Sequence, residues 1–345
     1  MNPDRLQQLI SAFPSLRVAV LGDFFLDKYL DTDPALTEIS VETGRNANQV
    51  VGIRRSAGAA GTVANNLSAL GAGTLHAVGG VGDDGEAFDL RRCLKDVRCS
   101  TDGLLSFDSL MTPTYLKPRD QTNRGLSGEY ERYDTKNRRP TPVAVMEQVL
   151  AALDRVLPHV DAVIVIDQVT EENCGMVTAP VRDAISERAQ RYPHVVFCAD
   201  SRRHIHEFRH IIVKPNQFEA LGIDRPAPGT VADPDAVRRR LSAWRQQTGA
   251  PVCVTLGERG MLVSDPAVTL IPGFAVEGPI DSTGAGDSAT AGLVLALAAG
   301  ATLPEAALVG NLVASITIQQ LATTGTATPA QLAARLDAWR RQHRQ

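Results

Sequence analysis

Short runs of apolar residues alternate along the chain with longer stretches whose apolar positions recur at helical spacing. The apolar runs predict buried strands at residues 17–23, 74–82, 162–168, 195–201, 210–216 and 251–257. The stretches between them predict helices at residues 62–71, 85–95, 143–157, 176–191 and 234–247. Because strands that alternate with helices form parallel sheets covered on both faces, the pattern predicts an α/β fold with a mostly parallel central sheet.

Polar residues stand at the ends of four predicted strands: Asp23, Asp167, Asp200 and Asn216. Ligands of open α/β sheets bind beyond the carboxyl ends of the strands. We therefore expect these four side chains to converge on one rim of the sheet.

Two segments interrupt the alternation, at about residues 31–57 and 111–136. Both are polar, β-branched in patches and poor in helical periodicity, so they predict strands of a small sheet that covers the rim as a lid. The whole chain, residues 1–345, is then expected to form a single domain whose lid comes from two insertions.

Composition and charge narrow the classes of partner. With 35 basic and 39 acidic residues the formal net charge is −4, and no long basic block indicates a nucleic-acid partner. The five cysteines are scattered and form no C-x-x-C pair, which predicts reduced thiols in a cytoplasmic protein. The amino terminus shows no secretory signal, and the apolar run at 289–299 is shorter than the roughly 20 residues that span a bilayer. We expect a core helix there and no membrane partner.

One glycine turn, GVGDDG at residues 80–85, matches the dinucleotide pattern G-x-G-x-x-G. Asp83 and Asp84 would lie against the pyrophosphate and repel it, so a structural turn is the better interpretation and a dinucleotide oxidoreductase is a weak alternative. The Walker pattern G-x-x-x-x-G-K-[ST] does not occur.

A second glycine turn, DSTGAGD at residues 281–287, precedes the apolar run. Gly284, Ala285 and Gly286 lack bulk, so the backbone can turn tightly and present N–H groups to an anion at the positive end of a helix. Asp287 stands at the same helix entry. It either caps the helix or accepts a proton from a hydroxyl that attacks a bound phosphorus, and the residues alone leave these two roles equally open.

DSTGAGD resembles the carboxyl-terminal signature of the ribokinase-like (PfkB) family of carbohydrate kinases, and further motifs follow in family order over nearly the whole chain. These are GDFFLD at 22–27, AGAAGTVANNLSALGA at 57–72, VGGVGDDGEAF at 78–88, KPNQFEA at 214–220, VTLGERGM at 254–261 and GNLVASITIQQLATTGTATP at 310–329. Within the family they look nearest to bacterial heptose-phosphate kinases, without a trailing nucleotidyltransferase domain. The resemblance implies a ribokinase-like three-layer sandwich with a small β lid.

For the sugar side, the resemblance implies that Asp287 is the base and that the N–H groups of Gly284, Ala285 and Gly286 form the anion hole. Asp27 would hold sugar hydroxyls, Gly58 would admit the sugar to the backbone, and Thr62 would contact one hydroxyl. Asp27 has a rival role as a cap of the next segment. The basic lid residues Lys117, Arg119 and Arg132 are better explained as solvated surface than as a phosphate site.

For the nucleotide side, the resemblance implies ATP and Mg²⁺, with Asn216 and Glu219 organising the magnesium ion through water. The ATP phosphates, ribose and adenine would be bordered by Thr255, Gly257, Gly260 and Asn311. Asp281 and Thr283 match positions that bind a monovalent cation, such as K⁺, in some relatives. Simpler roles compete: a strand-end turn for Asn216, turn glycines at 257 and 260, and a hydrogen bond within the helix layer for Asn311.

Three departures affect the sugar pocket. The usual Gly-Gly pair is Ala57-Gly58, the asparagine that normally follows is Thr62, and the strand end S-D-Y-x-K-G of similar heptose kinases is IDQVTEEN at 166–173, without the lysine. We expect an ATP-dependent carbohydrate kinase that phosphorylates a sugar or sugar-phosphate hydroxyl, and a homodimer formed through the lid. A nucleoside or simple pentose or hexose kinase, and a catalytically silent nucleotide or sugar sensor, are the alternatives.

Overall fold

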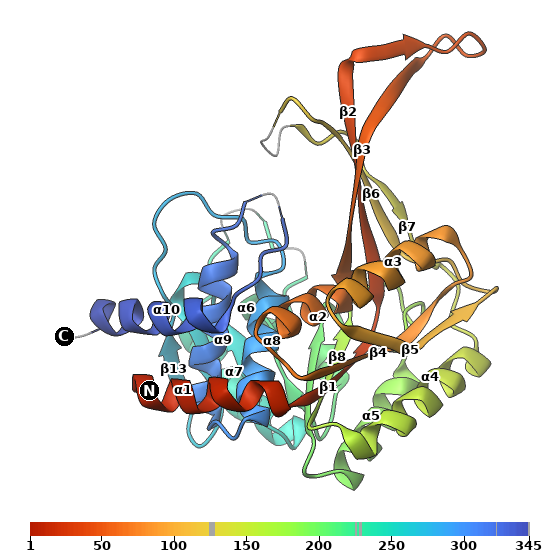
Figure 1. Cartoon of the computed structure of the whole chain (residues 1–345). Helices are drawn as coiled ribbons and strands as arrows, with labels where there is room; N and C mark the ends of the chain where they lie inside the picture. The colour runs from red at the N-terminus through yellow and green to blue at the C-terminus, as the bar shows by residue number, and fades with distance from the viewer. Residues whose placement is uncertain (124–127, 225, 228–229, 322, 344–345) are drawn as a thin grey trace.

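A six-stranded parallel sheet runs through the centre of the molecule (Figure 1). The computed structural model describes residues 1–123, 128–224, 226–227, 230–321 and 323–343. The strand order is β10-β9-β8-β1-β4-β5, and the strands are β1 (Arg17–Gly22), β4 (Thr74–Gly82), β5 (Cys99–Phe107), β8 (Ala162–Asp167), β9 (Val196–Ser201) and β10 (Ile212–Val213). Parallel bridges from Val213 to Val252 and from Asn216 to Thr255 continue it toward an antiparallel sheet of β11 (Cys253–Thr255), β12 (Gly260–Val263) and β13 (Thr269–Pro272).

Helices cover both faces of the central sheet and make a three-layer arrangement. In β1, Val18 and Val20 face one apolar core while Ala19 and Leu21 face the other, as the two-residue period of a strand requires. The first core packs against α1 (Pro3–Ala12), α2 (Ala60–Ala69), α3 (Gly85–Asp96), α8 (Ala285–Ala298), α9 (Leu303–Thr317) and α10 (Pro329–Gln342). The second core packs against α4 (Val143–Val156), α5 (Ala179–Arg191), α6 (Gln217–Leu221) and α7 (Pro234–Thr248).

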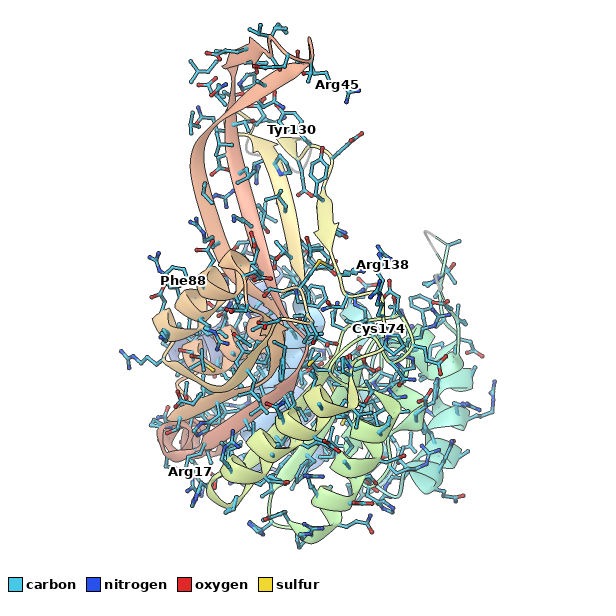
Figure 2. The ribbon with its side chains drawn as sticks, turned by 90° about the vertical axis from the view of Figure 1, so that its right-hand side faces the viewer. Arg17, Arg45, Phe88, Tyr130, Arg138 and Cys174 are labelled. Carbon is cyan, nitrogen blue, oxygen red and sulfur yellow. The ribbon has the colours of Figure 1, made fainter. Side chains whose placement is uncertain are left out.

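The lid is a four-stranded sheet of order β3-β2-β6-β7, formed by β2 (Phe24–Ile39), β3 (Asn46–Ala59), β6 (Thr114–Asp120) and β7 (Tyr133–Thr135). Its long β2–β3 hairpin projects away from the core, and Figure 2 shows Arg45 near the outer end. Strand β2 begins two residues after β1 ends, earlier than the predicted start near residue 31. Asp27 therefore lies inside a lid strand and not at the end of a core strand.

The structure confirms the predicted fold class, an α/β sandwich with a mostly parallel sheet and a small β lid. The apolar run at 289–299 falls almost entirely within α8 and is largely buried, as expected for a core helix. GVGDDG is a structural turn, because Asp84 caps α3 by accepting from the N–H of Ala87 at 2.8 Å. The predicted strand at 210–216 is wrong in length, since only Ile212 and Val213 are strand residues and Asn216 already caps the next helix.

The cysteines agree with the expectation of unpaired thiols. All five cysteines are free, and four of them are buried. In the part of the chain that the structure describes, no helix combines the length and apolarity needed to cross a membrane.

Candidate active site

The first turn of α8 is built from small residues and has an unusual start. Gly284 is the N-cap residue and has φ of 75°, in the left-handed region that favours glycine. A Cβ at Gly284 would lie 3.3 Å from Cγ2 of the buried Thr62, so α2 closes one side of this turn. The N–H of Ala285 donates to the carbonyl of Ser282 at 3.1 Å. The predicted anion hole therefore has one of its three N–H groups engaged within the turn.

Asp287 is the third residue of α8 and not its cap. The cap position belongs to Gly284, which supplies no side-chain hydrogen bond, so the N-cap interpretation of Asp287 is wrong. The carboxyl group is half-buried, and burial together with the negative charge of Asp200 raises its pKa to about 7. The positive charges of Lys214 and Arg202 act in the opposite direction. Asp287 thus has the pKa of a group that can accept a proton near neutral pH.

A buried ion pair lies directly under the first turn of α8. The Nζ atom of Lys214 is 2.8 Å from Oδ2 of Asp200, and the hydroxyl of Thr290 donates to the same oxygen at 3.0 Å. A Cβ built on Gly286 would lie 3.8 Å from that Nζ atom. The pair joins β9 to α8 and keeps positive charge beside the place where an anion would bind.

Asn216 and Glu219 form a capping box at the start of α6. The amide oxygen of Asn216 accepts from the N–H groups of Phe218 and Glu219, at 2.8 and 2.9 Å, and Oε2 of Glu219 accepts from the N–H of Asn216 at 2.7 Å. Burial and the nearby Asp200 raise the pKa of Glu219 to about 7. The N-x-x-E spacing therefore has a structural role of its own, beside the predicted one in binding magnesium.

These side chains fit a magnesium ion held mainly through water and phosphate oxygens. The negative charge of Asp200 disfavours ionisation of Glu219, and a divalent cation beside Glu219 would relieve that repulsion. The amide oxygen of Asn216 is already used by the helix cap. In the described residues no three His, Cys, Asp or Glu side chains gather to enclose a metal, and Mg²⁺ usually keeps several of its waters.

An apolar pocket of about 300 Å³ adjoins the first turn of α8. Its walls include four predicted nucleotide residues and two residues of the glycine turn: Thr255, Gly257, Gly260, Asn311, Ala285 and Gly286. Gly260 has φ of 100°, and any Cβ there would meet the carbonyl oxygen of Ile271 at 2.1 Å, so only glycine fits. Asn311 donates to that carbonyl at 3.0 Å, which ties α9 to β13 while the residue lines the pocket. Its volume and mostly apolar walls suit a small ligand that has an aromatic or apolar part.

Asp27 lies on lid strand β2 and is buried. Its Oδ1 is 2.7 Å from Nζ of Lys117 on the neighbouring strand β6. A Cβ on Gly58 would lie 2.4 Å from Oδ2 of Asp27, so this glycine makes room for the carboxylate. The interpretation of Lys117 as solvated surface is wrong, because its side chain is only 13% exposed and carries the charge that compensates Asp27. Arg132 pairs with Asp134, and Arg119 donates to the carbonyl of Asn123.

Two of the four strand-end residues border the site, and two hold loops. Asp200 and Asn216 lie beside Asp287 and Glu219, as expected for the rim. Asp23 instead accepts from the N–H groups of residues 168, 169 and 176, and Asp167 accepts from the Ser201 hydroxyl at 2.7 Å. Both carboxylates are only 3% exposed, and a buried carboxylate needs such donors. Asp23 and Asp167 thus stand at the same edge of the sheet as Asp200, as expected, but their carboxylates hold backbone and side-chain donors there.

The segment before α8 has its own internal hydrogen bonds. The N–H of Thr283 donates to Oδ1 of Asp281 at 3.0 Å, and the N–H of Asp281 donates to the carbonyl of Ile318 at 2.8 Å. These bonds shape the turn, and the binding of a monovalent cation by the two residues stays a prediction.

The arrangement joins an apolar pocket, a glycine turn at a helix N-terminus with Asp287 beside it, and the buried carboxylate of Asp27 on a lid strand. A sequence profile of the pfkB family of carbohydrate kinases matches residues 18–331. The chain belongs to this family. The predicted kinase class is thereby confirmed at the level of the family.

Two comparisons extend this assignment. The "Bifunctional protein HldE" of Caulobacter vibrioides is 31% identical over 340 residues, and that of Gluconobacter oxydans is 28% identical over 359. The match covers 96% of this chain in both and only 65% of the Caulobacter protein, so the chain spans under two thirds of that relative's length.

The structure of phosphofructokinase-2 from Escherichia coli, in complex with substrates and products, aligns with a TM-score of 0.65 at 19% identity. The alignment covers 93% of this chain and 100% of the phosphofructokinase chain. Ribokinase from Arabidopsis thaliana, complexed with ribose and ATP, aligns with a TM-score of 0.64 at 15% identity. That alignment covers 93% of this chain and 98% of the ribokinase chain. Both structures support the ribokinase-like fold.

Sequence reasoning did not assign three polar residues that border the site. Asp200 was expected at the rim without a role, and its partners Lys214 and Thr290 were not singled out. Lys214 comes two residues before the N-x-x-E segment, and a lysine in an otherwise buried strand is the signal that could have indicated a buried ion pair.

The capping box predicts how substitutions at Asn216 affect stability. Asn216→Ala should lower the free energy of unfolding by about 1 kcal/mol, because it removes the acceptor for two N–H groups, whereas Asn216→Asp keeps that acceptor. Urea denaturation of the protein without nucleotide or metal measures both values. Equal stability of the alanine and wild-type proteins would contradict the structural role.

Proposed function

We propose that this protein transfers the γ-phosphoryl group of ATP to a hydroxyl group of a sugar or sugar phosphate. The observation that carries the proposal is the position of Asp287. A half-buried carboxyl with a pKa of about 7 stands in the first turn of α8, next to Gly286, which lines the apolar pocket. A base of this kind accepts the proton of the attacking hydroxyl as its oxygen bonds to phosphorus.

The backbone at residues 284–286 stabilises the negative charge that develops on the phosphoryl oxygens. Helix N-termini suit this purpose because their N–H groups point outward and the helix dipole favours an anion. The N–H of Ala285 would join only if its bond to Ser282 opens. Lys214, buried behind Gly286, adds a fixed positive charge.

Magnesium, when bound, neutralises charge on the β- and γ-phosphates. Glu219, with Asp200 beside it, would hold the waters of that ion, and Asn216 would fix the position of Glu219 through the helix cap. Adenosine would occupy the apolar pocket, bordered by Thr255, Gly257, Gly260 and Asn311. K⁺ at Asp281 and Thr283 is an additional proposal that rests on the family resemblance alone.

The acceptor would bind between Asp27 and Asp287. Asp27 can accept hydrogen bonds from two neighbouring sugar hydroxyls, Gly58 leaves room for its carboxylate, and the lid strands would exclude water that would otherwise hydrolyse ATP. We favour a heptose phosphate because of the resemblance to heptose-phosphate kinases. Thr62 is buried against the glycine turn, which suits packing better than a grip on a sugar hydroxyl.

The test of this function is ADP release from ATP and magnesium across a panel of sugars, sugar phosphates and nucleosides. Turnover with one heptose phosphate supports the favoured acceptor, and turnover with a nucleoside or a simple sugar moves the assignment within the kinase class. ATP binding without turnover on any acceptor would favour the sensor.

Asp287→Asn should keep ATP binding and lower kcat by about 10²–10⁴, the usual contribution of a positioned base. Calorimetric titration with ATP and steady-state ADP release measure the two effects. Asp235→Asn, an exposed aspartate in the first turn of α7, is the matched control and should turn over like the wild type. Near-normal turnover by the Asp287 variant would refute the base.

The pKa of Asp287 predicts an acid limb in the pH profile. The base must be unprotonated to act, and its pKa is raised to about 7, so kcat/KM should rise with pH through neutrality and level off above it. The measurement is kcat/KM from pH 5.5 to 8.5 at saturating magnesium. A profile that is flat over this range would contradict the assignment.

We also propose that two copies pair through the lid. The β2–β3 hairpin carries exposed apolar side chains at Leu36, Ile39, Val41, Val50, Val51 and Ile53. Strand β3 is an edge of the lid sheet, and an exposed edge with apolar residues is suited to pairing with another chain.

Substituting both Val51 and Ile53 with lysine should shift the protein from dimer to monomer in light scattering, because like charges would face each other across the paired hairpins. Val143→Lys changes an exposed apolar residue on α4, which is not part of the lid, and should leave the mass unchanged. A wild-type protein that is monomeric at high concentration would refute the dimer.

A further inference from the structure

The two oxygens of the Asp27 carboxylate have different surroundings. Oδ1 accepts from the ammonium group of Lys117, whose Nζ lies 2.7 Å away on the neighbouring strand β6. Oδ2 lies against Gly58 on strand β3, so closely that a Cβ there would be 2.4 Å from it. This second oxygen accepts no hydrogen bond from any residue that the structure describes. Because Asp27 is only 7% exposed and a buried carboxylate needs hydrogen-bond donors, Oδ2 is left for the donors of a ligand.

Lys117 is held in place by more than this ion pair. Its Nζ atom donates to the Tyr29 hydroxyl at 3.3 Å, and it lies 4.8 and 5.8 Å from the ring centroids of Tyr29 and Tyr115. Aromatic faces attract an ammonium group, so the two rings and the hydroxyl restrict where it can lie. Tyr115 stands opposite Asp27 in the register of β2 and β6. The ammonium group is therefore fixed beside the carboxylate and sets its orientation.

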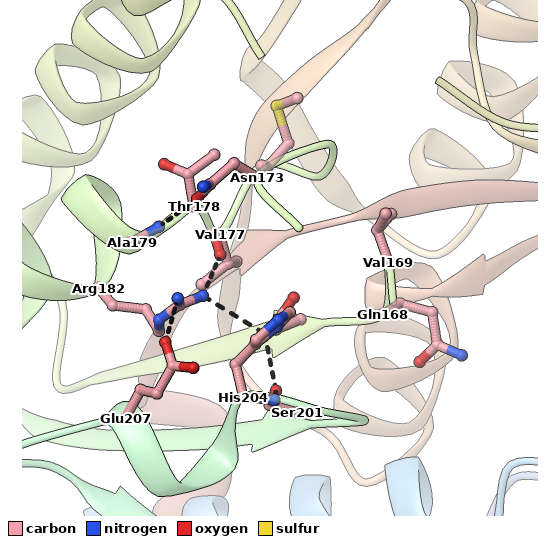
Figure 3. A network of polar contacts seen from close by, with 12 residues as sticks. Gln168, Val169, Asn173, Val177, Thr178, Ala179, Arg182, Ser201, His204 and Glu207 are labelled. Atoms are coloured by element: carbon pink, nitrogen blue, oxygen red, sulfur yellow. Dashed lines mark hydrogen bonds and ion pairs between the residues drawn. The ribbon is translucent and has the colours of Figure 1, made fainter. Parts of the chain in front are cut away.

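The aromatic wall around Lys117 is joined to the core. The rings of Tyr115 and Phe25 have their centroids 5.0 Å apart, and Phe25 forms a small buried cluster with Val169 and Cys174. Val169 comes from the loop after β8, and Figure 3 shows it to one side of the polar network at the ends of β8 and β9. Packing against this loop thus supports the position of Lys117.

The unpartnered oxygen of Asp27 lies near the glycine turn at 284–286. Gly58 comes two residues before α2 begins, and Thr62 follows in the first turn of that helix. A Cβ at Gly284 would lie 3.3 Å from Cγ2 of Thr62. The chain from Gly58 to Thr62 thus contacts the Asp27 carboxylate at one end and the glycine turn at the other. In agreement with this placement, the charge of Asp27 adds to the burial that raises the pKa of Asp287.

We propose that Lys117 is a positioning residue that orients Asp27 for the acceptor. By holding Oδ1, it leaves Oδ2 to accept hydrogen bonds from neighbouring hydroxyl groups of a sugar or sugar phosphate, and its charge offsets the cost of burying the carboxylate. The inference rests on the proposed kinase function and names the atom at which the acceptor binds. Lys117 acts through Asp27 and takes no proton in the transfer.

Lys117→Met tests the proposal, with Lys28→Met as its matched control. Lys28 follows Asp27 on β2, but its Nζ pairs with Glu86 of α3 at 3.2 Å, and its side chain is 20% exposed. Lys117→Met should raise the KM for the acceptor about 10- to 100-fold, the usual contribution of a hydrogen bond to a charged group, and leave the KM for ATP unchanged. Lys28→Met should keep both KM values. Lys117→Arg should recover part of the loss, because arginine also binds a carboxylate.

Gly58→Ala gives a second test that leaves Lys117 intact. Its methyl group would take the place of Oδ2 and displace that oxygen, so the KM for the acceptor should rise here too while the KM for ATP is kept. An unchanged KM for the acceptor in Lys117→Met or in Gly58→Ala would refute the proposal. An equal rise in Lys28→Met would trace the effect to a loosened lid and refute it as well.

A binding experiment separates this inference from the kinase assignment, because it needs no turnover. Each sugar and sugar phosphate of the panel is added to the protein without ATP, and the shift in Tm is recorded. A compound that stabilises the wild-type and Lys28→Met proteins should leave the Tm of Lys117→Met unshifted at the same concentration. If such a compound is never phosphorylated by the wild type, the proposed function fails and the role of Lys117 stands. Equal shifts in the wild-type and Lys117→Met proteins refute that role, and a wild type that neither binds nor phosphorylates any compound overturns both.

Discussion

The ion pair of Lys214 and Asp200 is the interaction on which the rest of the cleft depends. An anion site beside a carboxyl base is electrostatically unfavourable, because both the ligand and the base carry negative charge. Lys214 is 3% exposed and lies behind Gly286, so it counters that repulsion without occupying space in the cleft. Asp200 keeps this buried lysine charged and, through Thr290, fixes β9 to α8. The same carboxylate raises the pKa of Asp287 and of Glu219, so one pair sets the electrostatics of both the base and the proposed magnesium site.

The lid is joined to the site by a second buried pair. Asp27 belongs to β2 and Lys117 to β6, so the carboxylate proposed to hold the sugar stands on the lid sheet and not on the central sheet. The first residues of β2 are nevertheless buried, with Phe24, Phe25 and Leu26 at most 1% exposed. The base of the lid is therefore anchored in the core while the distal hairpin extends from it. Such a layout lets the outer lid move with little disturbance at Asp27.

The elements with strong local signals could be predicted from the sequence, and the residues that depend on distant partners could not. The glycine turn at 284–286 and the buried helix α8 follow from composition and apolar periodicity alone. The N-x-x-E segment was ambiguous because the same spacing serves a helix cap and a metal site, and the structure shows the cap. Asp23 and Asp167 stand at the rim as their strand-end positions indicate, but their donors come from the loop after β8 and from the last residue of β9, which no local pattern reveals. The start of the lid was misplaced because GDFFLD contains no turn signal, although the chain leaves the core sheet at Phe24.

The structure gives residues 166–173, which lie beside the end of β9, a role that the sequence alone does not indicate. Unlike the strand end S-D-Y-x-K-G of similar heptose kinases, this segment has no lysine. From the sequence alone, the missing lysine suggests only an altered sugar pocket. In the structure its Asp167 and Gln168 hold the backbone and the guanidinium of Arg202 on the adjacent strand. Positive charge is thus present at this edge of the sheet, supplied by β9 instead of β8. Because Gln168 belongs to this segment, a substitution there would change where the guanidinium of Arg202 is held.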